Sequence, residues 1–368
     1  MEVEEYKIAY SLGRLEESMK TFRKLGESCA DYVISSQLVM MADVLEDCVH
    51  VQDRLQDVED KTENQLVKEL QHRGIRAKNI CVMAQENDAK PQEVMLQART
   101  MRKGCISAKE IALVLGRVMG CEFLQSEMNR KLVNDVFHNY TFVQAPRFRT
   151  LVGQAGISKA SERVSGDNYA VTKLECGKVV ATLVDGMGSG RRASIESKAV
   201  VELVEQSLEA GFDEKMAISL INAAISAGTA CGNPVTIDMC VINSYLGVAN
   251  CIKLGAASTF IKREGWVEII KSTTLPIGVL EQTDYDCTRK KLYDGDYIIM
   301  VSDGILDNLP LADKEEQLVR MISEIDVKVP KLMAETILEA ALASNRHIAK
   351  DDMSVIVIGV FDTLSNMY

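Results

Sequence analysis

Residues 178–190 read KVVATLVDGMGSG, an apolar run that ends at Asp185 and is followed by three glycines within five residues. The run Val179–Val184 predicts a buried strand, and the glycines predict a sharp turn. Because glycine has no Cβ, such a turn lets the Gly186 carbonyl point at the same ion as the Asp185 carboxylate. A helix expected from about Ser194 would bring its positive N-terminal end close to an anionic phosphate. The stretch therefore indicates a metal and phosphate site, the alternative being a strand-to-helix turn without a functional role.

Three further acidic phrases lie at the edges of predicted strands in the C-terminal part of the chain. They are Ser165-Gly166-Asp167-Asn168, Val301-Ser302-Asp303-Gly304 and Asp351-Asp352-Met353-Ser354. Each phrase alone is more often a turn or a strand cap. Hard divalent cations bind oxygen, and Mg²⁺ or Mn²⁺ takes a few carboxylates and fills its remaining positions with water. Four such phrases together predict a two-metal hydrolytic centre, provided that the fold brings them into one place.

Composition excludes several other classes of function. The chain of 368 residues carries a net charge of −11, which opposes a nucleic-acid partner held by phosphate contacts. Its ten cysteines form no Cys-x-x-Cys pair and its four histidines are isolated, so neither a zinc site nor a Ser-His-Asp hydrolase is expected. The glycine-rich stretch also lacks the Gly-Lys-[Ser/Thr] of a P-loop and the glycine intervals of a dinucleotide fingerprint.

The same features predict a cytoplasmic protein with reduced thiols. The chain opens with Met-Glu-Val-Glu-Glu, which is acidic where a signal peptide would be basic. Its longest uncharged apolar stretches, such as 353–361, fall short of the roughly 18 residues of a membrane span. We therefore expect contact with a membrane only through a segment that this chain does not contain.

The N-terminal part is expected to divide into two segments. Residues 1–73 combine few glycines with interleaved charged and apolar residues, which predicts a helical hairpin or a short dimerising helix. The alternative is an amphipathic helix packed on its own domain. Residues 74–147 predict an α/β regulatory segment, with strands at 76–84 and 91–101. A capping box, Ser107 with Glu110 three residues later, predicts the start of a helix that ends at Gly120.

Residues 148–368 change to strands separated by glycine and interrupted by two pairs of helices, which favours an α+β sandwich over strict βαβ alternation. The helix pairs are expected at 194–210 with 214–225, and at 313–325 with 330–343. The predicted strands are 148–157, 169–174, 178–184, 239–245, 249–254, 258–262, 266–272, 297–301 and 354–360.

In this order, the four acidic phrases resemble those of the metal-dependent PPM-type Ser/Thr protein phosphatases of bacteria. Within that superfamily, Val-Asp-Gly-Met-Gly-Ser-Gly at 184–190 resembles the stage II sporulation protein E family, and the phrases at 255–258 and 275–278 resemble its later core strands. The resemblance covers about residues 148–362. It implies a PPM-type β-sandwich flanked by helix pairs and preceded by a helical and α/β regulatory region.

The resemblance also implies roles for individual residues, with two Mn²⁺ or Mg²⁺ ions as cofactors. Asp185 would bridge both ions and the Gly186 carbonyl would complete one of them. Asp303 and Asp351 would hold the other, so the implied catalytic residues are Asp185, Asp303 and Asp351. A water shared by the two ions would attack phosphorus in line.

Two positions extend this set of metal ligands. Asp167 resembles an additional acidic position near the first ion. Asp352 fills a place where many relatives have asparagine. Either member of the adjacent pair could therefore be the ligand, and Asp351 is favoured.

The activity implied is that of a phosphoserine/phosphothreonine protein phosphatase acting on a phosphorylated anti-sigma factor antagonist, in a sporulation-like partner-switching pathway. The family's namesake has a large N-terminal membrane region, so this chain would correspond to its cytosolic part. A homodimer formed through the N-terminal helices is a companion expectation. The competing hypotheses are a non-catalytic scaffold and a small-molecule phosphatase.

Overall fold

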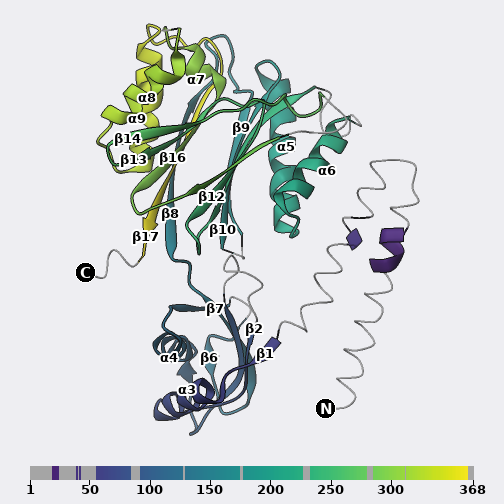
Figure 1. Cartoon of the computed structure of the whole chain (residues 1–368), viewed down its shortest axis with the longest axis vertical. Coiled ribbons are helices and arrows are strands. Elements are labelled where there is room, and N and C mark those ends of the chain that lie inside the picture. Colours follow the sequence, from purple (N-terminus) through teal and green to yellow (C-terminus); the bar gives the residue numbers. More distant parts are fainter. Residues whose placement is uncertain are drawn as a thin grey trace. The chain divides into compact units, whose positions relative to one another are not determined.

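Two separate units make up the chain, residues 1–146 and residues 147–368. The computed structural model describes residues 19–24, 39, 41–42, 55–83, 92–126, 129–174, 177–226, 233–279, 285–310 and 312–363. Most of the helical region predicted before residue 55 therefore lies outside the described residues, although residues 19–24 are helical (Figure 1). In the part of the chain that the structure describes, no helix is both long and apolar enough to cross a bilayer.

In the described part of the N-terminal unit between residues 55 and 146, the helices α3 and α4 pack on an antiparallel sheet. Its strand order is β1-β2-β3-β7-β5, and a separate two-stranded ribbon pairs β4 with β6. Apolar side chains of both helices, such as Leu66, Leu70 and Ile111, are fully buried together with Tyr140 and Phe142 of the sheet. The elements are β1 (Leu55–Asp57), α3 (Asp60–His72), β2 (Ile75–Met83), β3 (Glu93–Thr100), β4 (Ile106–Ser107), α4 (Lys109–Met119), β5 (Phe123–Gln125), β6 (Leu132–Val133) and β7 (His138–Gln144).

Local expectations for this unit are partly confirmed. Strands β2 and β3 lie where strands were predicted, and α4 ends at Gly120, which adopts the left-handed conformation that favours glycine there. The predicted capping box is wrong. Ser107 belongs to β4, the N-cap is Ala108, and Glu110 pairs with Arg73 instead of reaching back to the cap. The expected segment boundary at residue 73 falls between α3 and β2, which pack against each other.

The C-terminal unit contains two five-stranded antiparallel sheets. One has the order β15-β12-β11-β10-β9, and the other has the order β14-β13-β16-β17-β8. The strands are β8 (Phe148–Ile157), β9 (Asp167–Lys173), β10 (Lys178–Gly186), β11 (Val235–Asn243), β12 (Val248–Leu254), β13 (Thr259–Arg263), β14 (Trp266–Ile270), β15 (Asp286–Lys291), β16 (Asp296–Val301) and β17 (Met353–Asp362). All nine strands predicted for this unit are present, so the expected sandwich is confirmed.

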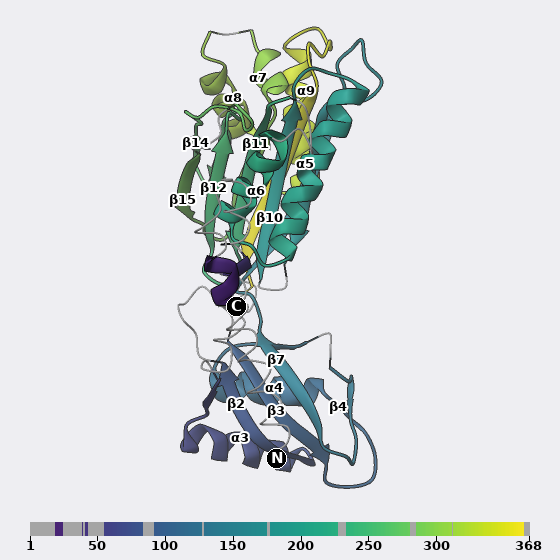
Figure 2. The same ribbon diagram turned by 90° about the vertical axis from the view of Figure 1, so that its right-hand side faces the viewer.

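Helices cover the outer faces of both sheets and make the unit a four-layered sandwich (Figures 1 and 2). The pair α5 (Arg191–Glu209) and α6 (Glu214–Ser226) buries apolar side chains against β10, β11 and β12. The helices α7 (Asp303–Asp307), α8 (Lys314–Glu324) and α9 (Pro330–Ala343) pack on the other sheet. A third apolar cluster, which includes Leu183, Ile298 and Ile356, fills the space between the sheets.

Candidate metal centre

The four acidic phrases meet at one end of the sandwich, where strands of both sheets end or begin. Asp185 lies at the end of β10, and its Cα partner across the sheet is Asp167, the first residue of β9. In the other sheet, Asp303 begins α7 directly after β16, and Asp351 and Asp352 directly precede β17. Strands β16 and β17 are hydrogen-bonded neighbours, so these carboxylates also start from adjacent positions.

Two glycines permit the close packing that brings these segments together. A Cβ on Gly186 would lie 2.8 Å from the carbonyl oxygen of Ala193, so glycine allows the first turn of α5 to pack on the end of β10. A Cβ on Gly304 would lie 2.0 Å from the carbonyl oxygen of Asp352. The Asp303-Gly304 pair is therefore more than a turn signal, because its glycine lets α7 contact the chain entering β17.

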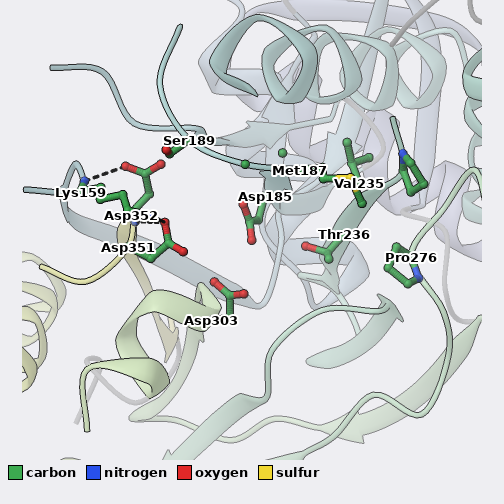
Figure 3. A pocket seen from close by; sticks show the side chains of 13 residues that line it. Lys159, Asp185, Met187, Ser189, Val235, Thr236, Pro276, Asp303, Asp351 and Asp352 are labelled. Carbon is green, nitrogen blue, oxygen red and sulfur yellow. Dashed lines mark hydrogen bonds and ion pairs between the residues drawn. The ribbon is translucent and has the colours of Figure 1, made fainter. Parts of the chain in front are cut away.

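A cavity of about 260 Å³ opens between these segments. Figure 3 shows the side chains of Asp185, Asp303, Asp351 and Asp352 around it, with Lys159 beside the last two. The other lining residues are Gly186, Met187, Gly188, Ser189, Pro234, Val235, Thr236 and Pro276. Among the described residues that line it, Lys159 is the only one with a cationic side chain, so this lining is strongly acidic.

Burial and mutual repulsion raise the pKa values of the crowded carboxylates. Burial raises the pKa of Asp185 to about 9, and the neighbouring charges of Asp167, Asp303 and Asp351 add to the effect. Asp303 is exposed at the cavity, but partial desolvation there, followed by the charges of Asp307 and Asp351, still raises its pKa. Such a cluster stabilises bound protons or cations, since each carboxylate disfavours ionisation of the next.

Asp167 lies behind this lining and is itself short of partners. Its side chain is buried, and neither carboxylate oxygen has a hydrogen-bond partner of normal geometry among the described residues. Burial raises its pKa to about 6, although the hydroxyls of Ser302 and Ser354 are near enough to oppose that shift. A buried carboxylate that has no well-formed hydrogen bond is costly unless a cation compensates it.

The two adjacent aspartates at the start of β17 have different surroundings. The Asp352 carboxylate is buried and accepts backbone N–H donors from Lys159 and Gly166, each at 2.8 Å. It therefore ties the loop between β8 and β9 to β17. The Asp351 side chain is 44% exposed, faces the cavity, and lies 3.6 Å from the Lys159 ammonium. Of the two carboxylates, that of Asp351 is the more accessible to a ligand, although its Oδ1 accepts the backbone N–H of Asp352 at 3.0 Å.

The donor set fits divalent cations of the Mg²⁺ and Mn²⁺ type. The acidic oxygens suit hard cations, and both the unpartnered oxygens of Asp167 and the repulsion around Asp185 would be relieved by positive charge. Among the described residues, however, no three His, Cys, Asp or Glu side chains converge closely enough to hold an ion by themselves. The carboxylates surround a space instead, which suits ions that keep several water ligands.

All five predicted aspartates and Gly186 thus lie in one region, four of the aspartates on the cavity and Asp167 behind it. No pattern in the sequence pointed to Lys159, which is held at the cavity by its backbone contact with Asp352 and places its ammonium beside Asp351. Thr236 was also missed, and its place is set by the register of β11, in which it is the Cα partner of Asp185. Pro276, within the phrase at 275–278, lines the cavity beside the Val235–Ile277 bridge.

Comparison with known families gives a match to this same part of the chain. The family model described as stage II sporulation protein E (SpoIIE) matches residues 175–361. The stage II sporulation protein E of Bacillus subtilis (strain 168) is 27% identical over 329 residues, which cover 89% of this chain and 39% of that protein. The protein of the same name from Priestia megaterium is 32% identical over 206 residues, covering 56% of this chain and 35% of that protein. The chain thus spans less than half the length of these curated relatives.

A solved structure extends the similarity to the fold. The structure of the PP2C phosphatase domain and a fragment of the regulatory domain of SpoIIE from Bacillus subtilis superposes with a TM-score of 0.64 at 27% identity. The match covers 90% of this chain and 95% of that one. PP2C is another name for the PPM type, so the predicted fold class is confirmed.

Proposed function

Because the chain belongs to the stage II sporulation protein E family, we propose that it is a metal-dependent phosphoserine/phosphothreonine protein phosphatase. The observation that carries this proposal is the acidic cavity at the end of the sandwich, where four aspartates from both sheets surround about 260 Å³. Its lining offers carboxylate and backbone oxygens, the kind of ligand that Mn²⁺ and Mg²⁺ prefer, and this supports the proposal of two such ions.

In this proposal Asp185 would serve both ions, the Gly186 carbonyl would add to the first, and Asp303 with Asp351 would hold the second. Two bound divalent ions would supply a water of lowered pKa and neutralise the charge of the phosphoryl oxygens. Asp167 supports the first ion from behind, and its partnerless oxygens favour that role. Asp352 is assigned a positioning role, because its carboxylate already accepts two backbone N–H groups.

Lys159 contributes one positive charge to the cavity beside its four carboxylates. Its backbone is fixed, since its N–H donates to Asp352 and its carbonyl accepts from Glu162, while its ammonium remains beside Asp351. With the carboxylates neutralised by cations, this ammonium is left to attract a dianionic phosphomonoester.

The surroundings of the cavity favour a protein substrate over a small molecule. A wider groove of about 690 Å³ adjoins it, shares Asp303 with it, and continues between residues 255–257 and the start of α8. A segment of polypeptide on either side of a phosphoserine could lie there. Following the family resemblance, we propose a phosphorylated anti-sigma factor antagonist as the substrate, in a partner-switching pathway of the cytoplasm.

Release of phosphate from a phosphoserine protein, measured with EDTA, Mg²⁺ or Mn²⁺, tests the proposal. We expect turnover by the wild type only with a divalent ion, and a loss of at least about 100-fold in Asp185→Asn, because even outer-sphere changes at metal sites cost about 10–100-fold. The matched control is Asp326→Asn, which removes an exposed carboxylate from the loop between α8 and α9. Metal-dependent binding of the phosphoprotein without any turnover would instead support a scaffold, and equal activity in Asp185→Asn would refute the assigned site.

A further inference from the structure

A fully buried ion pair lies on the neighbouring strands β11 and β12, close to the metal centre. Asp238 and Lys253 are Cα partners, and the Lys253 ammonium is 2.7 Å from Oδ2 of Asp238, with side-chain exposures of 0% for the lysine and 3% for the aspartate. The ammonium also donates to the carbonyl oxygen of Ala257, and the Thr259 hydroxyl donates to the same Oδ2. One oxygen of Asp238 therefore has two donors.

The other oxygen of Asp238 has none. Oδ1 is buried and lacks a hydrogen-bond partner among the described residues. A buried carboxylate oxygen is normally satisfied by protein or by ordered water, so this atom calls for an explanation. The pair is also an odd choice for stability alone, since a buried ion pair rarely contributes more than apolar side chains of the same volume.

A small cavity explains the free oxygen. It has a volume of about 30 Å³, and its lining includes Asp238 together with Asp185 and Asp303. Its remaining lining consists of Leu183, Thr236, Gly255, Ala256, Ala257, Val301 and Ser302. A space of this volume holds a water molecule, and a polar lining supplies the two to four partners that a buried water needs.

The geometry points to a buried water that links Oδ1 of Asp238 to the carboxylate of Asp185 or Asp303. A water has two hydrogens, so it can donate one to Asp238 and the other to the metal-binding carboxylate. Asp238 is then a positioning residue that holds a metal ligand in place through this water. Lys253 cancels the charge of Asp238, so that an acceptor is provided without adding net negative charge beside the crowded carboxylates. This inference rests on the metal centre proposed above.

Two double variants with the same net charge isolate the acceptor. Asp238→Leu with Lys253→Met replaces the pair by apolar side chains of similar volume and removes the acceptor. Asp238→Asn with Lys253→Met also removes both charges but keeps an amide oxygen that can accept from the water. Mn²⁺ binding is measured by calorimetry without substrate, together with the melting temperature of each variant.

We expect the leucine double variant to bind Mn²⁺ at least about 10-fold more weakly than the wild type. Loss of an outer-sphere partner of a metal ligand typically costs about 10–100-fold in metal affinity. The asparagine double variant should stay within about 3-fold of the wild type. The melting temperature of the leucine double variant should not fall much, because replacement of a buried ion pair by apolar side chains of similar volume is often tolerated. Equal Mn²⁺ affinity in the leucine variant and the wild type would show that the pair is only structural, and would overturn the inference.

A third variant tests the water link without altering the ion pair, so its result does not depend on whether the double variants fold. Ala256→Val fills the small cavity from its loop wall without touching the ion pair, so it should weaken Mn²⁺ binding in the same direction. Unchanged binding in that variant would also contradict the water link. If the wild type itself bound no Mn²⁺, the proposed function would fail together with this inference. If the wild type bound Mn²⁺ and the leucine and valine variants bound it equally well, only this inference would fail.

Discussion

Asp185 has the most strongly shifted pKa among the aspartates of the cavity, and that shift connects metal binding to stability. Its folded-state pKa is raised to about 9 from 3.8, and that of Asp167 is raised to about 6 from the same value. Between the unfolded and folded values the native state binds more protons than the unfolded chain, so stability falls as pH rises. The contribution is fully present below pH 3.8 and is lost as pH passes about 6 and then about 9.

Without divalent ions, we therefore expect the melting temperature to fall between pH 6 and pH 9. Saturating Mg²⁺ or Mn²⁺ should reduce the decline, because the ions replace the protons that the carboxylates lose. Thermal unfolding across this range, with and without metal, measures both slopes. Asp185→Asn should flatten the metal-free slope, and a slope as steep as that of the wild type would show that the decline does not arise from the Asp185 carboxylate.

The adjacent aspartates before β17 should separate activity from stability. Asp351→Asn is expected to reduce phosphate release by at least about 100-fold with little change in stability, because its carboxylate faces the cavity. Asp352→Asn removes one of the two acceptors for the Lys159 and Gly166 amides, and should destabilise the fold by about 1–3 kcal/mol. Urea unfolding and a phosphate-release assay on both variants check this, and the reverse pattern would exchange their roles.

At the scale of elements, apolar patterning predicted the sandwich well but not its polar edge. The strands next to the core, such as β16 and β17, consist of continuous runs of mostly apolar residues. Such runs can be recognised in a sequence. Strand β15 was missed because it is an edge strand of mostly polar residues in which half-buried and exposed positions alternate. Helix α7 was missed because five residues are too few to show a helical period.

The short helix α7 nevertheless has a definite role, because it presents Asp303 to the cavity. Gly304→Ala would place a Cβ 2.0 Å from the Asp352 carbonyl oxygen, which is backbone and cannot move away cheaply. We expect a loss of about 1–3 kcal/mol in stability and weaker Mn²⁺ binding as α7 is displaced. Glu335→Ala in α9 is the control, since that side chain is 49% exposed and pairs with Lys331 on the same helix at the surface. Similar behaviour of the two variants in urea unfolding and Mn²⁺ titration would contradict the packing argument.

For the whole molecule, the acidic phrases at strand edges predicted one site only on the condition that the fold brings them together, and it was the family resemblance carried by their order that implied it does. The sequence could not show that the Asp352 carboxylate accepts hydrogen bonds from two backbone N–H groups. Nor could it show that Lys159 and Asp238 lie near the proposed metal centre. Those facts depend on strand register and loop contacts between residues far apart in the chain. Even the capping box was misread, because Ser107 is used by a ribbon with β6.

The two units have separate apolar cores, so they should unfold separately. Every proposed ligand lies in residues 147–368. We expect calorimetry of the full chain to show two transitions, of which only one rises with Mn²⁺. A chain of residues 147–368 should reproduce that transition and its response to Mn²⁺. A single transition, or an ion-dependent shift in both, would show that the units are energetically coupled.

The proposed ligands are spread along the C-terminal unit, from Asp167 after its first strand to Asp351 before its last. The carboxylates of β9 and β10 are brought together by local pairing, but those beside β16 and β17 join them only when the two sheets pack, so the full set of proposed ligands forms late in folding. The non-local pairings of such a topology also form late and slowly. Contacts that are absent from the transition state act on unfolding alone. Divalent ions should therefore leave the folding rate almost unchanged and slow the unfolding rate. Bound cations would then increase the kinetic stability of the folded unit without helping it to fold.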